Sequence, residues 1–276
     1  MPNIICRTYL FVPATRTDRV AKAWSAEPDA VILDLEDAVP PANKSTARDA
    51  AARDLRGARA VFVRVNGPET EWYDEDLKLC AMIGAAGLVV PKAENPEHLR
   101  YATQRLPAGI PVLPLIETAR GFANLAGLCA APQVQRLVFG SIDFQVDLGI
   151  AGEGEELLYF RSGLVLASRL AGIQPPVDGV TVEIHDARIV RDDALRAKRL
   201  GFGGKLCIHP KQITPVTECF CPSNEEVAWA KRVVEAAAAA NGGAVSVDGK
   251  MVDRPVILTA EEILTESTRT PARELL

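Results

Sequence analysis

The chain has 276 residues, of which 48% are hydrophobic and 24% charged, and its formal net charge is -5 at pH 7. This length and composition predict one large α/β domain with a full core, plus a tail. The acidic balance argues against a nucleic-acid partner, which would need clustered basic residues, and no uncharged apolar run is long enough to cross a membrane. The six cysteines are scattered, mostly within apolar stretches, so we expect a cytoplasmic protein with reduced thiols.

Short apolar, β-branched runs recur along the chain, with helical or turn segments between them. Eight runs are predicted to be strands: Thr8 to Val12, Ala30 to Leu33, Ala60 to Val65, Leu88 to Val90, Val112 to Ile116, Leu137 to Phe139, Gly179 to Ile184, and Leu206 to Ile208. Near-continuous hydrophobic strands that alternate with helices indicate a parallel sheet, and eight repeats favour closure into a (β/α)8 TIM barrel. An open doubly wound sheet is the alternative, although no glycine-rich dinucleotide fingerprint follows the first strand.

The chain continues well beyond the eighth predicted strand. We expect a barrel over residues 1–222 and a C-terminal extension over 223–276. Ser223 is typical of an N-cap and predicts an alanine-rich helix through Ala240, ended by Asn241-Gly242-Gly243. An extended segment from Ala244 to Val247, a turn at Asp248-Gly249 and a last helix starting near Thr259 should follow. Because this tail is too small to fold alone, we expect it to pack on its own barrel or on a neighbouring subunit.

Two predicted strands end abruptly in a single carboxylate, Glu117 after the fifth strand and Asp143 after the sixth. In a parallel barrel the C-terminal ends of neighbouring strands form one rim, where catalytic groups are placed. Carboxylate oxygens on a rigid rim suit Mg²⁺, which keeps waters and completes its shell with an anionic substrate. The pattern therefore predicts a Mg²⁺ site and a metal-dependent enzyme. Taken singly, each carboxylate could instead cap or begin the following helix.

Other charged residues follow the remaining strands. Glu36 and Asp37 come after the second strand, Arg64 ends the third, and Lys92 follows the fourth. Charges gathered at the ends of apolar strands are costly unless they pair or bind a ligand, so this rim is predicted to bind substrate. As alternatives, Arg64 could pair with Glu94 or Asp37, and Lys92 could also form a rim salt bridge. Since Glu36 and Asp37 are neighbours on an extended segment, only one should face the site.

A series of short motifs runs in one order from Thr8 to about Leu264, across nearly the whole chain. They are Leu10-Phe11-Val12-Pro13, Leu33-Asp34-Leu35-Glu36-Asp37-Ala38-Val39, Arg64-Val65-Asn66-Gly67, Pro91-Lys92, Leu115-Ile116-Glu117-Thr118, Phe139-Gly140-Ser141-Ile142-Asp143-Phe144, Gly203-Gly204-Lys205-Leu206-Cys207-Ile208-His209-Pro210 and Gly249-Lys250-Met251-Val252-Asp253. With these motifs the sequence resembles the citrate lyase beta-subunit-like proteins and the malyl-CoA lyases of the HpcH/HpaI aldolase superfamily.

This resemblance implies a (β/α)8 barrel that forms homo-oligomers, as trimers or hexamers, and a Mg²⁺ ion held by Glu117 and Asp143. It implies that Arg64 faces the thioester oxygen of the substrate and that Asp37 helps to position metal-bound waters. These residues would form the catalytic centre, with Glu36 and Lys92 nearby on the rim.

The resemblance also implies contacts outside that centre. Arg16 and Lys22 would bind coenzyme A, and Asp253 in the tail would reach into the neighbouring subunit's site as an acid or base. The implied reaction is reversible cleavage of a carboxylated 3-hydroxyacyl-CoA, such as citryl-, malyl- or citramalyl-CoA, into acetyl-CoA and a 2-keto acid. Two alternatives stay open: an aldolase on free 2-keto acids without coenzyme A, and the beta subunit of a multi-subunit citrate lyase acting on an acyl-carrier-protein thioester.

Overall fold

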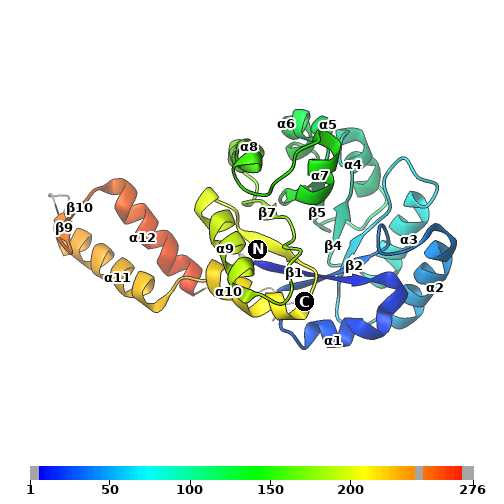
Figure 1. The fold of residues 1–276 in the computed structure, drawn as a ribbon, viewed down its shortest axis with the longest axis horizontal. Coiled ribbons are helices and arrows are strands. Elements are labelled where there is room, and N and C mark those ends of the chain that lie inside the picture. The colour runs from blue at the N-terminus through cyan, green and yellow to red at the C-terminus, as the bar shows by residue number, and fades with distance from the viewer. Residues whose placement is uncertain (1–5, 240–244, 269–276) are drawn as a thin grey trace.

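Eight parallel strands form a closed barrel at the centre of the molecule (Figure 1). The computed structural model describes residues 6–239 and 245–268, and its strands are hydrogen-bonded in sequence order, with the last paired to the first. The predicted TIM barrel is thus confirmed and the open sheet is excluded. The strands are β1 (Thr8–Pro13), β2 (Ala30–Asp34), β3 (Phe62–Arg64), β4 (Gly87–Val90), β5 (Val112–Ile116), β6 (Val138–Phe139), β7 (Val177–Asp178) and β8 (Gly204–Cys207).

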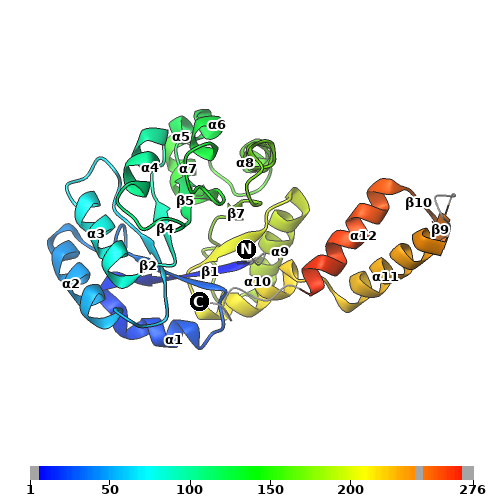
Figure 2. The same cartoon turned by 180° about the vertical axis from the view of Figure 1, so that it is seen from behind.

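Helices connect the strands and surround the barrel (Figures 1 and 2). No helix in the described part of the chain is both long and apolar enough to cross a membrane. The helical segments up to the end of the barrel are η1 (Ala14–Arg19), α1 (Val20–Trp24), η2 (Pro41–Asn43), α2 (Lys44–Asp54), α3 (Tyr73–Ile83), α4 (Pro96–Thr103), α5 (Ala119–Ala123), α6 (Leu125–Cys129), α7 (Ser141–Leu148), η3 (Glu155–Leu157), α8 (Leu158–Ala171), α9 (Ala187–Leu200), η4 (Pro210–Gln212) and α10 (Ile213–Phe220).

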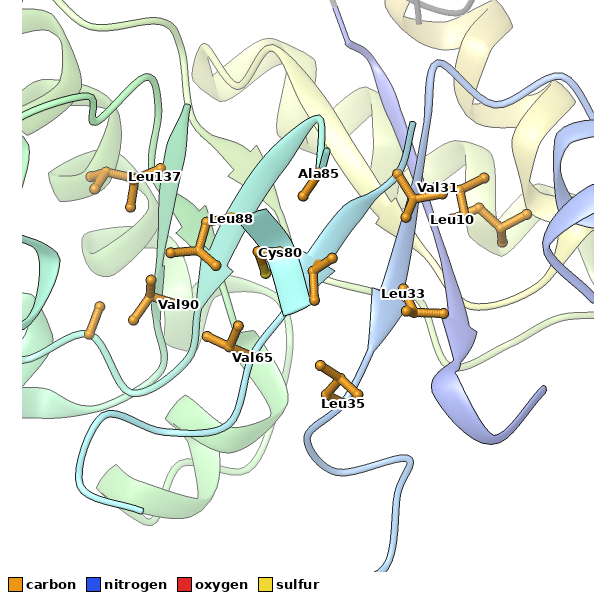
Figure 3. Close-up of a cluster of buried hydrophobic side chains, with 14 of the residues drawn as sticks. Leu10, Val31, Leu33, Leu35, Val65, Cys80, Ala85, Leu88, Val90 and Leu137 are labelled. Atoms are coloured by element: carbon orange, nitrogen blue, oxygen red, sulfur yellow. The ribbon is translucent and has the colours of Figure 1, made fainter. Parts of the chain in front are cut away.

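Both faces of each strand are buried, which explains why the strands are near-continuous hydrophobic runs. In β2, Ala30 and Ile32 belong to the cluster that fills the barrel, whereas Val31 and Leu33 belong to the larger cluster under the helices. Figure 3 shows part of this outer layer, including Val31, Leu33 and Leu88. Because successive side chains of a strand point to opposite faces, one apolar run supplies both layers.

The seventh strand lies before the predicted segment. Gly179 to Ile184 was expected to form it, but the structure places β7 at Val177–Asp178 and leaves residues 179–186 irregular. The reason is that Asp178 is fully buried within the barrel wall, where Arg161 pairs with it at 2.9 Å. Two prolines followed closely by the charged Asp178 are typical of a turn, so the sequence pattern did not indicate a strand at this position.

The C-terminal extension is a helical hairpin that projects away from the barrel (Figures 1 and 2). It comprises α11 (Asn224–Ala239), the antiparallel strands β9 (Val245–Val247) and β10 (Lys250–Val252), and α12 (Arg254–Ser267). Its helices share a small apolar core that includes Val233, Val252 and Ala260. At the barrel end, Glu266 on α12 pairs with Arg7 at 3.0 Å.

Two expectations about the hairpin meet different outcomes. Ser223 does cap α11, because its hydroxyl accepts from the Glu226 N–H at 3.1 Å and the Glu226 carboxylate accepts from the Ser223 N–H at 2.7 Å. The start of the last helix near Thr259 was wrong, since α12 begins at Arg254, directly after its N-cap Asp253. The predicted helix end at Ala240 to Gly243, and Ala244, lie outside the described residues. The 222/223 domain boundary and packing on a neighbouring subunit stay predictions.

Candidate active site

A cavity of about 320 Å³ lies at the C-terminal ends of the barrel strands. It brings together Glu117, Arg64 and Asp143, which come from just after β5, from the end of β3 and from the first turn of α7, the helix that follows β6. Apolar side chains such as Phe11 and Phe139 line the rest of its wall. The rim residues Glu36, Asp37 and Lys92 line a second, larger cavity of about 500 Å³, which Glu117 and Asp143 do not line. The two candidate metal ligands therefore place the chemistry in the smaller cavity.

Glu117 is held rigidly at the mouth of the barrel. It is 2% exposed, and its Oε1 accepts a hydrogen bond from the Lys92 backbone N–H at 2.7 Å. A Cβ atom at residue 140 would lie 2.8 Å from Glu117 Oε2, so only glycine lets the chain pass this close to the carboxylate. Thr118, not Glu117, caps α5 by accepting from the Gly121 N–H at 3.1 Å. The helix-cap alternative for Glu117 is therefore wrong.

Asp143 lies in the first turn of α7 and lines the same cavity. The N-cap position of this helix is Gly140, so Asp143 is not the cap. Its side of the helix is open to solvent, in contrast to Glu117, which is sealed in the rim. One buried and one accessible carboxylate thus share one cavity.

The electrostatics of this pair fit a divalent cation. Burial, the Glu36 charge and the Asp143 charge together raise the pKa of Glu117 from 4.5 to about 8, although the Lys92 amide and Arg64 oppose them. A bound cation would offset the cost of burying the ionised carboxylate and its repulsion from neighbouring carboxylates, so these oxygen donors suit Mg²⁺. Among residues 6–239 and 245–268 no group of three or more His, Cys, Asp or Glu side chains is arranged to hold a metal. Glu117 and Asp143 remain the pair of ligands that the sequence predicts.

Arg64 places a positively charged guanidinium in the cavity wall, and the pairing of β2 with β3 fixes its main salt-bridge partner. Asp34 and Arg64 are paired residues of β2 and β3, and the guanidinium binds both Asp34 oxygens, at 2.7 Å from Nε and 2.6 Å from Nη2. Its Nη1 lies 3.1 Å from Glu36 Oε2 and 3.4 Å from Asp37 Oδ2. Burial opposes the charge, but these carboxylates outweigh it and raise the pKa of Arg64. The guanidinium is therefore charged and oriented before any ligand binds.

The predicted salt-bridge partners of Arg64 are half correct. Asp37 contacts it, as the distance above shows, but Glu94 does not pair with it. Glu94 instead accepts from the Thr118 hydroxyl at 2.8 Å and lies 3.4 Å from Arg120. Glu94 therefore belongs to the neighbouring β4–β5 side of the rim.

Asp34 is the site residue that the sequence reasoning missed. It is 3% exposed and, besides Arg64, its oxygens accept from the backbone N–H groups of Glu36 at 2.9 Å and Ala38 at 3.3 Å. One carboxylate thus orients the arginine and shapes the turn after β2. The available signal was its position as the last residue of β2, next to a strand that ends in arginine.

Glu36 and Lys92 form the second part of the charged rim. Glu36 is buried and Asp37 is exposed, so one of the two neighbours faces inward, and Lys92 Nζ lies 3.0 Å from Glu36 Oε1. The Lys44 ammonium holds this turn by donating to the Leu35 and Glu36 carbonyls, both at 2.7 Å. Lys92 has a φ of 47°, a left-handed conformation that is strained for a residue with a side chain. That conformation accompanies the amide bond from Lys92 to Glu117.

Three residues from the resemblance lie away from the cavity within one chain. Arg16 is exposed and pairs with Asp18 at 2.8 Å, and Lys22 is exposed on α1; neither lines the cavity. Asp253 caps α12 by accepting from the Val256 N–H at 3.3 Å. Figure 1 places the start of α12 at the outer end of the hairpin, remote from the barrel.

Comparison with known proteins agrees with this geometry. A family model for HpcH/HpaI aldolase/citrate lyase matches residues 7–210. The chain belongs to this family. It is 38% identical to a citrate lyase subunit beta-like protein of Deinococcus radiodurans, over 96% of this chain and 98% of that one. It is also 32% identical to a (3S)-malyl-CoA thioesterase of Cereibacter sphaeroides, over 95% of this chain and 94% of that one.

A solved structure shows what one relative binds. The Mycobacterium tuberculosis protein CitE, in complex with magnesium, acetoacetate and coenzyme A, is 34% identical to this chain with a TM-score of 0.83, and the match covers 95% of this chain and 98% of that one. The protein described here is therefore an enzyme of the citrate lyase beta-like class of lyases, whose structural relatives bind magnesium.

Proposed function

We propose that this protein is a Mg²⁺-dependent carbon–carbon lyase that cleaves, or forms, a carboxylated 3-hydroxyacyl-CoA such as citryl-, malyl- or citramalyl-CoA. The products of cleavage are acetyl-CoA and a 2-keto acid. The observation that carries the proposal is the meeting of Glu117, Asp143 and Arg64 in one cavity. The magnesium, acetoacetate and coenzyme A bound to the M. tuberculosis relative support it. The cysteines of the protein described here are all free thiols, which fits the cytoplasmic location that we propose for it.

Cleavage requires a base for the 3-hydroxyl proton, a sink for the electron pair of the breaking bond, and an acid for the resulting carbon. When bound, Mg²⁺ would supply Lewis acidity toward the oxygens of the keto-acid half. Glu117 and Asp143 would hold it, and Asp37 at the rim would position waters beside it. In this scheme the 3-hydroxyl proton passes to solvent water in the cavity, the bond between carbons 2 and 3 breaks, and its electron pair flows into the thioester, whose oxygen becomes an enolate oxygen.

Arg64 is the proposed stabiliser of that enolate oxygen. Its Nη2 group has two hydrogens and gives one to Asp34, so the second can point at a ligand oxygen. Asp34 and Glu36 fix the guanidinium beforehand, and a preorganised donor of this kind is worth about 10²–10³ in rate when it acts on developing charge. Lys92 and Glu36 would complete the substrate-binding rim, while Arg16 and Lys22 would contact coenzyme A outside the barrel mouth.

Asp253 is the proposed acid that protonates the enolate carbon, acting on the site of a neighbouring subunit. The support is its position. It begins the helix at the outer end of a hairpin that points away from its own barrel (Figure 2), so it can serve a site only in another copy. This assignment requires a homo-oligomer, a trimer or hexamer, in which each hairpin covers the next barrel mouth.

The test is product analysis with purified protein, Mg²⁺ and a panel of thioesters and acids. The proposal predicts acetyl-CoA and a keto acid from at least one of citryl-, malyl- or citramalyl-CoA, and no turnover by Glu117→Gln or Asp143→Asn. Turnover of free 4-hydroxy-2-keto acids, with no turnover of the thioesters, would favour the hypothesis of an aldolase that does not use coenzyme A. Activity that appears only after addition of an acyl carrier protein would favour the citrate lyase subunit. Full activity in both carboxylate variants would refute the metal site.

A further inference from the structure

The first turns of α7 are tied to one carboxylate. Ser141 Oγ and Gln145 Nε2 both donate to Glu153 Oε1, at 3.0 Å and 2.6 Å. Residues four apart share a helix face, whereas the residue midway between them is rotated by about 200° from each. Asp143 is that residue. Clamping residues 141 and 145 therefore sets the direction in which Asp143 faces the cavity.

A buried arginine holds Glu153 in turn. Arg161 on α8 is 1% exposed; its Nη2 donates to Glu153 Oε2 at 2.8 Å and its Nη1 donates to the Glu153 carbonyl at 2.7 Å. Its Nε donates to Asp178 Oδ1 at 2.9 Å. The arginine thus joins the loop before α8 to strand β7, and both oxygens of the Glu153 carboxylate have partners.

The chain of contacts returns to α7 through the barrel wall. Lys205 Nζ lies 3.8 Å from Asp178 Oδ2 and donates to the Gly179 carbonyl at 2.6 Å. A Cβ atom at residue 179 would lie 2.5 Å from Ser141 Oγ, so glycine allows the β7 end to pack directly on the start of α7. Two cations and two carboxylates balance within this network, in which Arg161, Asp178 and Lys205 are buried and Glu153 is partly exposed.

We propose that Glu153, anchored by Arg161, is a positioning residue that aims Asp143 at the metal. This inference rests on the proposed function, in which Asp143 is a ligand. Glu117 and Asp143 are the two proposed protein ligands. If the first turn of α7 could rotate, the Asp143 carboxylate would move away from the metal position and half of the protein ligands would be lost. Partners that orient metal ligands typically contribute about 10–100-fold to metal affinity.

The test is titration of the full-length, metal-free protein with Mn²⁺, with free Mn²⁺ measured by electron paramagnetic resonance. Glu153→Ala should raise the Mn²⁺ dissociation constant by about 10–100-fold. Glu153→Gln keeps an acceptor oxygen for residues 141 and 145 and should recover most of the affinity. If Glu153→Ala does not fold, the Ser141→Ala/Gln145→Ala double variant removes the same link while leaving the ion pairs in place, and the same loss is expected.

A matched control lies at the opposite end of the barrel. Arg136 is 2% exposed and donates to the Cys6 carbonyl at 2.7 Å and the Pro175 carbonyl at 2.8 Å, so Arg136→Met also removes a buried arginine. It should lower thermal stability without changing Mn²⁺ affinity. Equal losses of affinity in both variants, or wild-type affinity in folded Glu153→Ala, would overturn the positioning role. Wild-type affinity in Asp143→Asn would instead refute the metal site itself.

Discussion

Replacing Glu117 by glutamine should stabilise the metal-free protein, and increasingly so as the pH rises. Burial is the first cause, and the charge of Glu36 the second, of a Glu117 pKa raised from 4.5 to about 8. Between these two pH values the folded protein holds a proton that the unfolded chain has released. The stability of the metal-free wild type therefore falls as the pH rises through this window, and a neutral side chain escapes the loss.

The size of the effect follows from the shift. One pKa unit corresponds to 1.36 kcal/mol, so a rise from 4.5 to about 8 costs the folded protein ~5 kcal/mol well above pH 8, ~3 kcal/mol at pH 7 and ~1 kcal/mol at pH 5. Glutamine keeps an oxygen for the Lys92 N–H, and the cost of burying its amide group does not depend on pH. The advantage of Glu117→Gln over the wild type should thus grow by ~4 kcal/mol between pH 5 and pH 9.

The assay is urea unfolding in the presence of a chelator at pH 5, 7 and 9. Asp143→Asn is the control: it removes the other candidate ligand from an exposed position, and because burial and the Glu36 charge remain, it should keep most of the wild-type pH dependence. If the free energies of unfolding of Glu117→Gln and wild type change in parallel across this range, the argument that burial raises the pKa of Glu117 in the metal-free protein is refuted.

Three other predictions concern the site. Saturating Mg²⁺ should raise the thermal unfolding temperature of the wild type but not that of Glu117→Gln or Asp143→Asn. The Mg²⁺ affinity of the wild type should rise with pH up to about 8, because Glu117 must lose its proton on binding. An affinity that calorimetry shows to be independent of pH would contradict this. Arg64→Lys loses the two-point contact with Asp34 and should lower kcat about 10²–10³-fold in steady-state assays, whereas near-normal kcat would remove Arg64 from catalysis. Asp253→Asn should abolish turnover without changing Mn²⁺ affinity, and hybrid oligomers of Asp253→Asn with Glu117→Gln protomers should regain activity; inactive hybrids would exclude a cross-subunit role.

Much of the architecture was readable from local pattern. The strands are apolar on both faces because the barrel interior and the helix layer each bury one face. Consecutive residues such as Val31, Ile32 and Leu33 are therefore all hydrophobic, and this run is visible in the sequence. Ser223 was recognised as a cap for a similar reason, since a cap is a contact between residues three apart. Glu117 and Asp143 were chosen as candidate site residues because a charge close behind an apolar run stands out in the sequence, and the structure places both at one cavity.

Contacts between distant segments needed the folded chain. The partner of Arg64 is Asp34 because the β2–β3 register sets them side by side, and no spacing along the chain distinguishes Asp34 from Glu94. The seventh strand was misplaced because Asp178 is tolerated in the barrel wall through its pairing with Arg161, 17 residues earlier, and with Lys205.

Local pattern thus determined the eight-strand barrel and the two carboxylates at its mouth, because hydrophobic burial and strand ends depend on neighbouring residues. Tertiary structure alone decided which charges meet, how Glu153 clamps the start of α7, and how burial raises the pKa of Glu117. The physical reason is that electrostatic energy depends on distance through space and on the exclusion of water, and both are set only when strands and helices have packed.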